Sequence, residues 1–520
     1  MPQHRPRIMH VMSCPEDELM TEQHYLALKA RDSRFDGLFF TGVTSTGIYC
    51  RPVCRVRTPK RENCRFFSQP AQAERAGFRP CLRCRPELAP RAGAGSHGAE
   101  ARVWSMQDAS SILAGQAAEL IDAPERWGDT TPSMQLLAQR MGVSDRHLRR
   151  IFEARFGVSP LQYLQTRRLL SAKQFLTDTT LPVSEVARLS GFASVRSFNT
   201  AFAQHYALNP SQLRRSASTG GSGRVEPGVI LKLAYRPPYD VNAMLQFFAS
   251  RSVAGTEQIS LLPAHMSISR TVSVDIGQQH YSGWLVARFD AVGQRLELRL
   301  SDSLRPVLPA MLARVRSMLD LDADPLAINA VLHASFPRGD GLRVPGSLDG
   351  FELAVRAVLG QQITVAAART LTTRLVQAFG EPIETPIAGL NRLFPRAATL
   401  ADASPDALGR LGIVKQRQAA ILALARAVVA QGLQLHAGAD VEATMAALKA
   451  LSGIGDWTAQ YIAMRALRWP DAFPAGDVAL HRALGLQGSK HPAKEAELKS
   501  KAWQPWRSYA VRRAWKELAT

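Results

Sequence analysis

The most informative absences in this 520-residue sequence concern cysteine and long hydrophobic runs. All six cysteines lie within the first 84 residues, so most of the chain has no disulfide framework of the kind that small secreted domains use. Nowhere do 18 apolar residues follow one another, which argues against a membrane-spanning helix. Residues 1–14 also lack the apolar core of a signal peptide. We therefore expect a cytoplasmic protein with no membrane partner.

Acidic residues are few relative to basic ones. The chain has 44 Asp and Glu against 64 Lys and Arg, a net charge of +20 that is spread along the whole sequence. A positive surface of this kind suits a polyanion such as DNA. A generic basic protein would have the same balance, so charge alone leaves both interpretations open.

Two stretches of small residues divide the chain. Residues 89–102 are rich in Ala, Gly and Pro, and 216–226 contain the string S-T-G-G-S-G, which cannot bury enough surface to become ordered. Apolar residues alternate at 272–276 and 296–300 as in strands, and helical spacing begins at 305. The sequence therefore predicts a multidomain, mainly α protein. Its expected parts are a flexible tail (1–19), a small zinc-bound α/β module (20–90), a linker (91–103), a double helix-turn-helix domain (104–215), a second linker (216–226), a small antiparallel β-sheet domain (227–304) and an all-α domain (305–520).

Two short cysteine pairs form the strongest local signal. Cys50 and Cys54 are separated by three residues, and Cys81 and Cys84 by two. Each pair can present two thiolates to one ion, and four thiolates complete the tetrahedral shell of zinc. We predict one zinc ion here, and a closed site of four thiolates is usually structural. Cys64 falls outside the pairs and is expected to be an ordinary packed thiol.

The residues around these pairs resemble the N-terminal module of the Ada family of alkylation-response proteins. The matching strings are T-G-I-Y-C-R-P-x-C at 46–54 and G-F-R-P-C-x-x-C at 77–84. The resemblance implies that Cys50 is both a zinc ligand and the acceptor of a methyl group from a methylphosphotriester in DNA. Methylation of one of four thiolates removes a negative charge, so DNA should then bind more tightly. Candidates for steering phosphate toward the site are Arg51, Arg55, Arg57, Lys60 and Arg61.

The middle part contains a repeated helix-turn-helix pattern. Gly142 supplies a turn, Ser144 can cap the following helix, and the spacing of Ala138 and Gly142 recurs later in the chain. Residues 133–215 resemble the AraC-type DNA-binding domain, which implies that the helix at 145–156 enters a major groove. The expected DNA contacts on this helix are Arg146, Arg149 and Arg150. A helical linker domain is the alternative.

The second copy departs from the family pattern at two positions. Thr200 stands where an arginine is common, and Ala207 where a glycine is common.

Four strings in the last part resemble the AlkA type of DNA glycosylase, of the helix-hairpin-helix superfamily. They are Y-R-P-P-Y-D at 235–240, V-R-A-V-L-G-Q at 355–361, L-S-G-I-G-D-W-T-A at 451–459 and P-W-R-S-Y-A at 505–510. Gly453 and Gly455 allow a tight hairpin whose backbone amides can bind a DNA phosphate, although a packing turn is the alternative. The resemblance places Gln362 where relatives carry an apolar residue that wedges into the duplex.

The resemblance also implies a catalytic aspartate after the hairpin. Asp477 fits this position better than Asp471, although Asp477 can equally cap a helix. Its expected role is to stabilise the positive charge that develops on the sugar and to orient the attacking water. Trp457 stands where glycosylases that also cut the backbone carry a lysine, so only hydrolysis is expected. Trp457, Tyr461 and Trp515 are candidates for the pocket of the flipped base, or else are core aromatics.

The sequence thus predicts a protein of DNA alkylation repair. Its expected activity is hydrolysis of the N-glycosidic bond of 3-methyladenine and related alkylated purines, fused to a zinc-cysteine methyl acceptor and transcription activator. The alternative is a transcriptional regulator whose C-terminal half only binds DNA. A suicidal methyltransferase for alkylated guanine is excluded because no cysteine follows Cys84. The expected partners of a monomeric chain are alkylated duplex DNA, promoter DNA and RNA polymerase.

Overall fold

The computed structural model describes residues 15–91, 106–123, 127, 132–217, 228–277 and 279–518, which divide into two compact units after Pro86. Most of the predicted tail, with Cys14, and most of both predicted linkers lie outside the described residues. Within the described ranges, every helix is too short or too polar to cross a membrane.

The first unit is a small four-stranded sheet with two helices. Its strands have the order β3-β1-β2-β4, in which β2 and β4 are parallel and the other pairs antiparallel. The core beneath the sheet is aromatic and includes Phe39, Phe40, Tyr49 and Phe78. The elements are α1 (Pro15–Ala30), β1 (Phe40–Val43), β2 (Ile48–Cys50), β3 (Cys64–Phe67), α2 (Pro70–Arg75) and β4 (Arg79–Pro80). This arrangement is the predicted α/β module.

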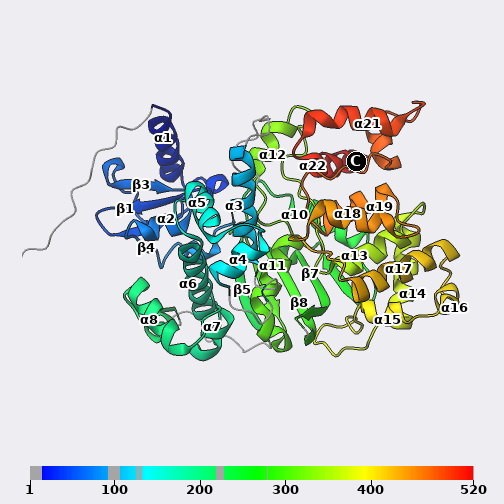
Figure 1. Ribbon diagram of the computed structural model, residues 1–520, viewed down its shortest axis with the longest axis horizontal. Coiled ribbons are helices and arrows are strands. Elements are labelled where there is room, and N and C mark those ends of the chain that lie inside the picture. Colours follow the sequence, from blue (N-terminus) through cyan, green and yellow to red (C-terminus); the bar gives the residue numbers. More distant parts are fainter. Residues whose placement is uncertain are drawn as a thin grey trace, which may run out of the picture. The chain divides into compact units, whose positions relative to one another are not determined.

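Among its described residues, the second unit begins with the helices α3 to α9, which contain two helix-turn-helix motifs, α4–α5 and α7–α8 (Figure 1). Gly142 and Gly191 occupy the two turns with positive φ angles of 67° and 79°. The helices are α3 (Met106–Asp122), α4 (Met134–Arg140), α5 (Asp145–Phe156), α6 (Pro160–Asp178), α7 (Val183–Leu189), α8 (Val195–Tyr206) and α9 (Pro210–Ala217). The predicted double motif is therefore present.

The two copies end their second helix differently. Gly157 closes α5 in the left-handed conformation, and Ala207 closes α8 in the same conformation with φ of 54°. A left-handed non-glycine residue costs about 1–2 kcal/mol. Glycine would relieve this strain, but part of the gain would be offset because glycine loses more conformational entropy on folding. Replacing Ala207 by Gly is therefore expected to raise the free energy of unfolding of the second unit by about 0.5–1 kcal/mol.

Chemical denaturation would measure this change. The matched control is Ala203→Gly, an exposed position inside the same helix, which should lower stability by about 1 kcal/mol. Equal losses for both substitutions would contradict the strain assigned to Ala207.

A five-stranded antiparallel sheet follows, with the order β5-β9-β8-β7-β6. Its elements are β5 (Val229–Ala234), α10 (Val241–Ala249), β6 (Glu257–Ser260), β7 (Ser267–Ile276), β8 (Gln279–Asp290) and β9 (Arg295–Leu300). The alternating segments at 272–276 and 296–300 lie in β7 and β9, as predicted. The helix-turn-helix helices and the sheet share one hydrophobic core, and Gln174 of α6 donates a hydrogen bond to the carbonyl of Lys232 in β5 (2.9 Å).

The remainder of the second unit is helical, as predicted, and has a second large core. The helices are α11 (Leu308–Met318), α12 (Pro325–Leu332), α13 (Gly350–Leu359), α14 (Val365–Phe379), α15 (Ala397–Ala401), α16 (Pro405–Gly409), α17 (Lys415–Gln431), α18 (Val441–Ala450), α19 (Asp456–Arg465), α20 (Val478–Ala483), α21 (Pro492–Ser500) and α22 (Arg507–Glu517). The central helix α13 packs against α14, α17 and α19, so residues far apart in sequence meet around it.

Candidate zinc site, DNA-contact elements and base pocket

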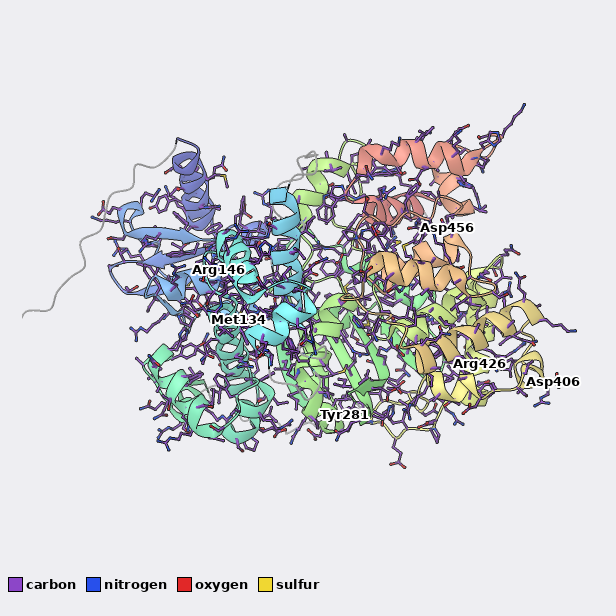
Figure 2. All side chains as sticks on the ribbon, viewed as in Figure 1. Met134, Arg146, Tyr281, Asp406, Arg426 and Asp456 are labelled. Atoms are coloured by element: carbon purple, nitrogen blue, oxygen red, sulfur yellow. The ribbon has the colours of Figure 1, made fainter. Side chains whose placement is uncertain are left out.

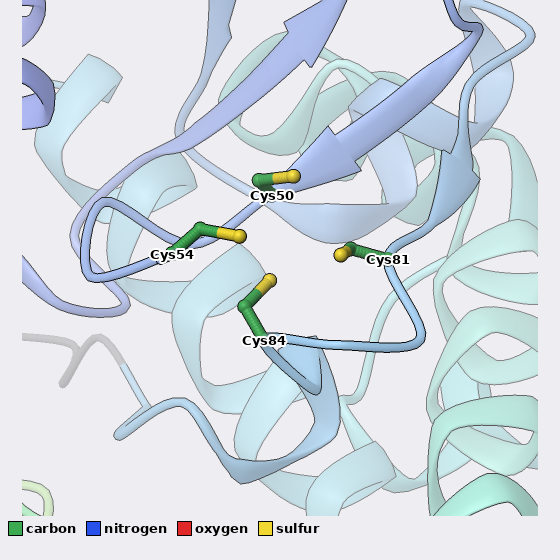
Figure 3. Close-up of side chains that lie close together, drawn as sticks. All are labelled: Cys50, Cys54, Cys81 and Cys84. Atoms are coloured by element: carbon green, nitrogen blue, oxygen red, sulfur yellow. The ribbon is translucent and has the colours of Figure 1, made fainter. Parts of the chain in front are cut away.

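Four cysteine sulfurs converge at one end of the first sheet. Cys50 ends β2, Cys54 follows a turn, and Cys81 and Cys84 come after β4. The four Sγ atoms lie within 4.8 Å of one another and point toward a common centre (Figure 3). Sulfurs on one tetrahedral zinc ion are about 3.8 Å apart, because each Zn–S bond is about 2.3 Å long. The cluster therefore fits zinc, as predicted.

Arg51 does not face solvent, contrary to the expectation that it steers phosphate. Its guanidinium is buried and forms a two-pronged ion pair with Asp36. Nη1 also donates to the carbonyl oxygen of Cys84 (3.1 Å), and the backbone N–H of Arg51 donates to the sulfur of Cys84 (3.4 Å). Such a buried, fully engaged guanidinium fixes the two cysteine loops to each other. Arg55 and Arg57 are exposed and remain candidates for phosphate contact.

Cys64 lies apart from the cluster. It begins β3, is buried, and its thiol donates to the carbonyl oxygen of Lys60 (3.3 Å). Burial raises the pKa of this thiol, which keeps it protonated. Lys60 and Arg61 make long ion pairs with glutamates at the surface, and the Arg61 guanidinium also lies over the rings of Tyr25 and Phe66.

Helix α5 separates its basic and apolar side chains. Ser144 caps the helix by accepting the N–H of His147 (3.3 Å). Figure 2 marks Arg146 on this helix. The exposed side chains include Arg146, Arg149 and Arg150, and the buried ones are Leu148, Ile151 and Phe152. The three predicted contact residues therefore lie on the solvent side, as a recognition helix requires.

The predicted hairpin joins α18 to α19. Gly453 has a positive φ of 85°, and a Cβ there would lie 2.9 Å from the Cβ of Ala420. Both the backbone conformation and the close packing therefore favour glycine at this position. Gly455 caps α19 with extended backbone, and no atom lies within 4 Å of the place of its missing Cβ. Gly455 and Asp456, which Figure 2 marks, are exposed at the start of α19, where amides without a helical partner can bind a phosphate.

A pocket of about 420 Å³ opens between α13, α14, α19, α20 and α22, large enough for a purine base. Asp477, Trp457, Tyr461 and Trp515 all line it, so the structure brings the four predicted residues together. The rings of Trp457 and Tyr461 are stacked at 5.3 Å and 14°, and the Trp515 ring lies 6.2 Å from Tyr461. The three rings are half-buried and form pocket wall rather than closed core.

Asp477 is held by donors on both oxygens. Its Oδ2 accepts the indole N–H of Trp457 (2.9 Å), and its Oδ1 accepts that of Trp515 (3.0 Å) and the backbone N–H of Leu480 (2.6 Å). The aspartate is therefore a helix cap and a pocket carboxylate at once. Asp471, the alternative, is bound instead by Arg507 through two bonds of 2.8 Å.

Three arginines of the pocket were not predicted from the sequence. Arg251, Arg356 and Arg465 line it, and of the three only Arg356 lies in one of the strings matched in the sequence. Arg465 donates to the hydroxyl of Tyr461 (2.6 Å). Burial raises the pKa of Tyr461, but the charges of Arg465 and Arg251 outweigh it, so the pKa of this phenol lies below its ordinary value.

Arg356 belongs to a buried ion network that fixes the pocket wall to the sheet. It binds Glu352 one turn away (2.8 Å) and Glu257 in β6 (3.2 Å), and both acids also bind Arg270 in β7. A signal was present in the string V-R-A-V-L-G-Q, where a charged residue interrupts an apolar helix face.

Gln362 lies exposed in the loop after α13, with a left-handed φ of 54°. The preceding Gln361 anchors this loop by donating to the carbonyl of Gly453 (2.9 Å) and to the hydroxyl of Thr458 (3.0 Å). Strained non-glycine residues held by their surroundings are typical of functional loops. The wedge role of Gln362 stays a prediction.

Models of four protein families match the chain in order along its length. They are the metal binding domain of Ada (23–87), a helix-turn-helix domain (137–216), the AlkA N-terminal domain (230–349) and the HhH-GPD superfamily of base excision DNA repair proteins (355–508). The predicted fold classes are therefore confirmed.

Curated relatives give the same combination. A "Probable bifunctional transcriptional activator/DNA repair enzyme AlkA" of Mycobacterium tuberculosis is 35% identical over 506 residues, which cover 96% of each chain. "DNA-3-methyladenine glycosylase 2" of Escherichia coli is 35% identical over 283 residues, covering 54% of this chain and 95% of that one. The E. coli "Bifunctional transcriptional activator/DNA repair enzyme Ada" is 34% identical over 158 residues, covering 30% of this chain and 39% of that one. The chain thus belongs to the family of bifunctional transcriptional activators and DNA repair enzymes that join an Ada-type metal-binding domain and a helix-turn-helix domain to an AlkA-type glycosylase.

Proposed function

We propose that residues 227–520 hydrolyse the N-glycosidic bond of 3-methyladenine and related alkylated purines in duplex DNA. The observation that carries the proposal is the carboxylate of Asp477 in a pocket walled by Trp457, Tyr461 and Trp515. The name of the E. coli glycosylase supports the substrate class. A degenerate half that only binds DNA would have no need of a carboxylate buried to 9% exposure among indole donors.

Different residues of the chain bind the DNA backbone, hold the flipped base and stabilise the transition state of this reaction. The hairpin at Gly453 and Gly455 binds the DNA backbone, and Gln362 fills the gap left by the flipped nucleotide. The aromatic wall stacks on the alkylated base, whose positive charge favours electron-rich rings. Asp477 stabilises the positive charge that grows on the sugar as the bond breaks, and orients the attacking water. The base is already cationic, so it leaves without a general acid.

The reaction is proposed to stop at hydrolysis. Among the described residues that line the pocket there is no lysine, and Trp457 cannot form a Schiff base. Borohydride is therefore expected to trap no covalent complex between the protein and duplex DNA that contains an alkylated purine. A bifunctional glycosylase run in parallel is the positive control, and a trapped adduct would contradict hydrolysis as the sole step.

For residues 20–90 we propose that Cys50 accepts the methyl group of a methylphosphotriester. Zinc, when bound by Cys50, Cys54, Cys81 and Cys84, keeps the acceptor sulfur as a thiolate at neutral pH. The exposed Arg55 and Arg57 draw the phosphate backbone to it. Loss of one negative charge on methylation then strengthens DNA binding by the module.

Residues 104–215 complete the proposal as the promoter-reading part of a transcription activator. Two helix-turn-helix motifs within one chain supply two recognition helices, so a monomer suffices for binding, and RNA polymerase is the proposed partner at the promoter. The test of the whole is twofold. Purified protein should release 3-methyladenine from methylated duplex DNA, and its intact mass should rise by one methyl group after incubation with methylphosphotriester DNA.

A further inference from the structure

A small hollow lies beside Cys50, between α1, the strands β1 and β2, and the segment after Cys54. Its volume is about 10 Å³, which is room for one water-sized group. Leu28 of α1, Val43 of β1 and the segment after Cys54, with Val56 and Pro59, form most of its wall. The wall is therefore mainly apolar.

The hollow is separate from the place of the metal ion. It touches Cys50 and Cys54 but neither Cys81 nor Cys84, whereas the ion must touch all four sulfurs. A group attached to the sulfur of Cys50 can therefore enter the hollow without displacing the ion's other ligands.

Thr41 contributes a polar group, its hydroxyl, to the wall of the hollow. Its side chain is fully buried, and its hydroxyl has no hydrogen-bond partner among the described residues. Thr41 and Cys50 are direct partners across β1 and β2, so their side chains stand next to each other on the same face of the sheet. A buried hydroxyl without a partner costs desolvation free energy, which points to a ligand or reacting group at this place.

We propose that this hollow receives the methyl group on Cys50 and limits the transfer to methyl. The inference rests on the proposed role of Cys50 as acceptor. In the step, the sulfur forms a bond to the methyl carbon and the bond from that carbon to the phosphotriester oxygen breaks. The electron pair leaves with the oxygen as a phosphodiester anion, and no proton moves because the sulfur is already a thiolate. A longer alkyl group meets the apolar wall.

The experiment compares methyl and ethyl transfer within one protein. The zinc-loaded full chain is incubated with duplexes that carry a single methylphosphotriester or a single ethylphosphotriester, and intact mass spectrometry gives both rates. The ethyl-to-methyl rate ratio is compared between wild type and Val56→Ala, which removes wall from the hollow. Because the same two duplexes are used for every variant, the lower intrinsic reactivity of an ethyl group cancels.

The expected result is a ratio at least about tenfold higher in Val56→Ala, the discrimination that one methylene in an apolar pocket provides. The matched control is Val53→Ala, a half-buried valine between Cys50 and Cys54 that does not line the hollow, and its ratio should stay at the wild-type value. Should Val56→Ala lose its zinc, Thr41→Ser enlarges the same hollow by one methyl group and keeps the hydroxyl.

Two outcomes would overturn the inference in distinguishable ways. Rapid methyl transfer with the same ethyl-to-methyl rate ratio in wild type, Val56→Ala and Thr41→Ser would show that the hollow does not select the alkyl group. Cys50 would then still be the acceptor. A wild-type protein that binds zinc yet takes up neither alkyl group would remove the acceptor role of Cys50 and the inference with it.

Discussion

Replacing Asp477 by Asn is expected to slow release of 3-methyladenine from methylated duplex DNA at least about a hundredfold, with binding of the duplex retained. The substitution keeps the shape of the side chain but removes the negative charge that the positive sugar needs in the transition state. Single-turnover release of the base and a binding titration on the same duplex would measure the two effects separately.

The structure says what else this substitution changes. The asparagine oxygen can keep the cap of α20 and the bond from Trp515, while its amide then faces the indole N–H of Trp457, a donor against a donor. That conflict costs about 1–3 kcal/mol and is expected to lower the thermal stability of the second unit. Stability must therefore be measured beside the rate.

Asp471→Asn provides the matched control for this loss. It makes the same chemical change six positions earlier and weakens the ion pair with Arg507, so it also lowers stability. Its rate of base release should stay near that of wild type because Asp471 is absent from the pocket wall. A rate for Asp477→Asn within about tenfold of wild type, or equal losses in both variants, would refute the role of Asp477.

The pocket illustrates which residues the sequence could reveal. Trp457 belongs to the hairpin string, and Asp477 follows that string at the position where the resemblance implies a catalytic aspartate. In the structure the indole nitrogen of Trp457 lies 2.9 Å from Oδ2 of Asp477. Arg251, just after α10, and Arg465 of α19 are more than two hundred positions apart in sequence, yet both lie over the ring of Phe247 and line the pocket. No local pattern encodes such a meeting, so these guanidinium groups could not be predicted.

The same distinction applies to the rest of the chain. Alternation made β7 and β9 predictable, while the four-residue β6 and the helix α10 between β5 and β6 were not anticipated. Arg51 looked like a surface charge because its neighbours Arg55 and Arg57 are basic. Its buried partner, Asp36, is fifteen positions away and precedes β1, so only the folded sheet reveals the pair.

Removal of zinc is expected to unfold the first unit and leave base excision intact. The sheet of this unit is small, and the loops that carry Cys50, Cys54, Cys81 and Cys84 are joined to one another by the cluster, by Arg51 and by the two-residue pairing of β2 with β4. Structural zinc contributes about 10–16 kcal/mol in small domains, more than a core of this size can replace. Dialysis against a chelator should therefore make residues 20–86 sensitive to protease, while release of 3-methyladenine continues.

Single substitutions separate the metal from the thiol chemistry. Cys84→Ser should reproduce the effect of the chelator, because it removes one of four ligands and leaves the buried Arg51 to bridge a disordered loop. Cys64→Ala is the matched control: it removes a buried thiol of the same unit that is no ligand, so zinc binding and protease resistance should persist. For both variants, elemental analysis would measure the zinc content and limited proteolysis would measure the protease resistance of the first unit. Protease resistance of the first unit without zinc would mean that the aromatic core alone holds the sheet, and the metal would then serve the reactivity of Cys50 rather than the fold.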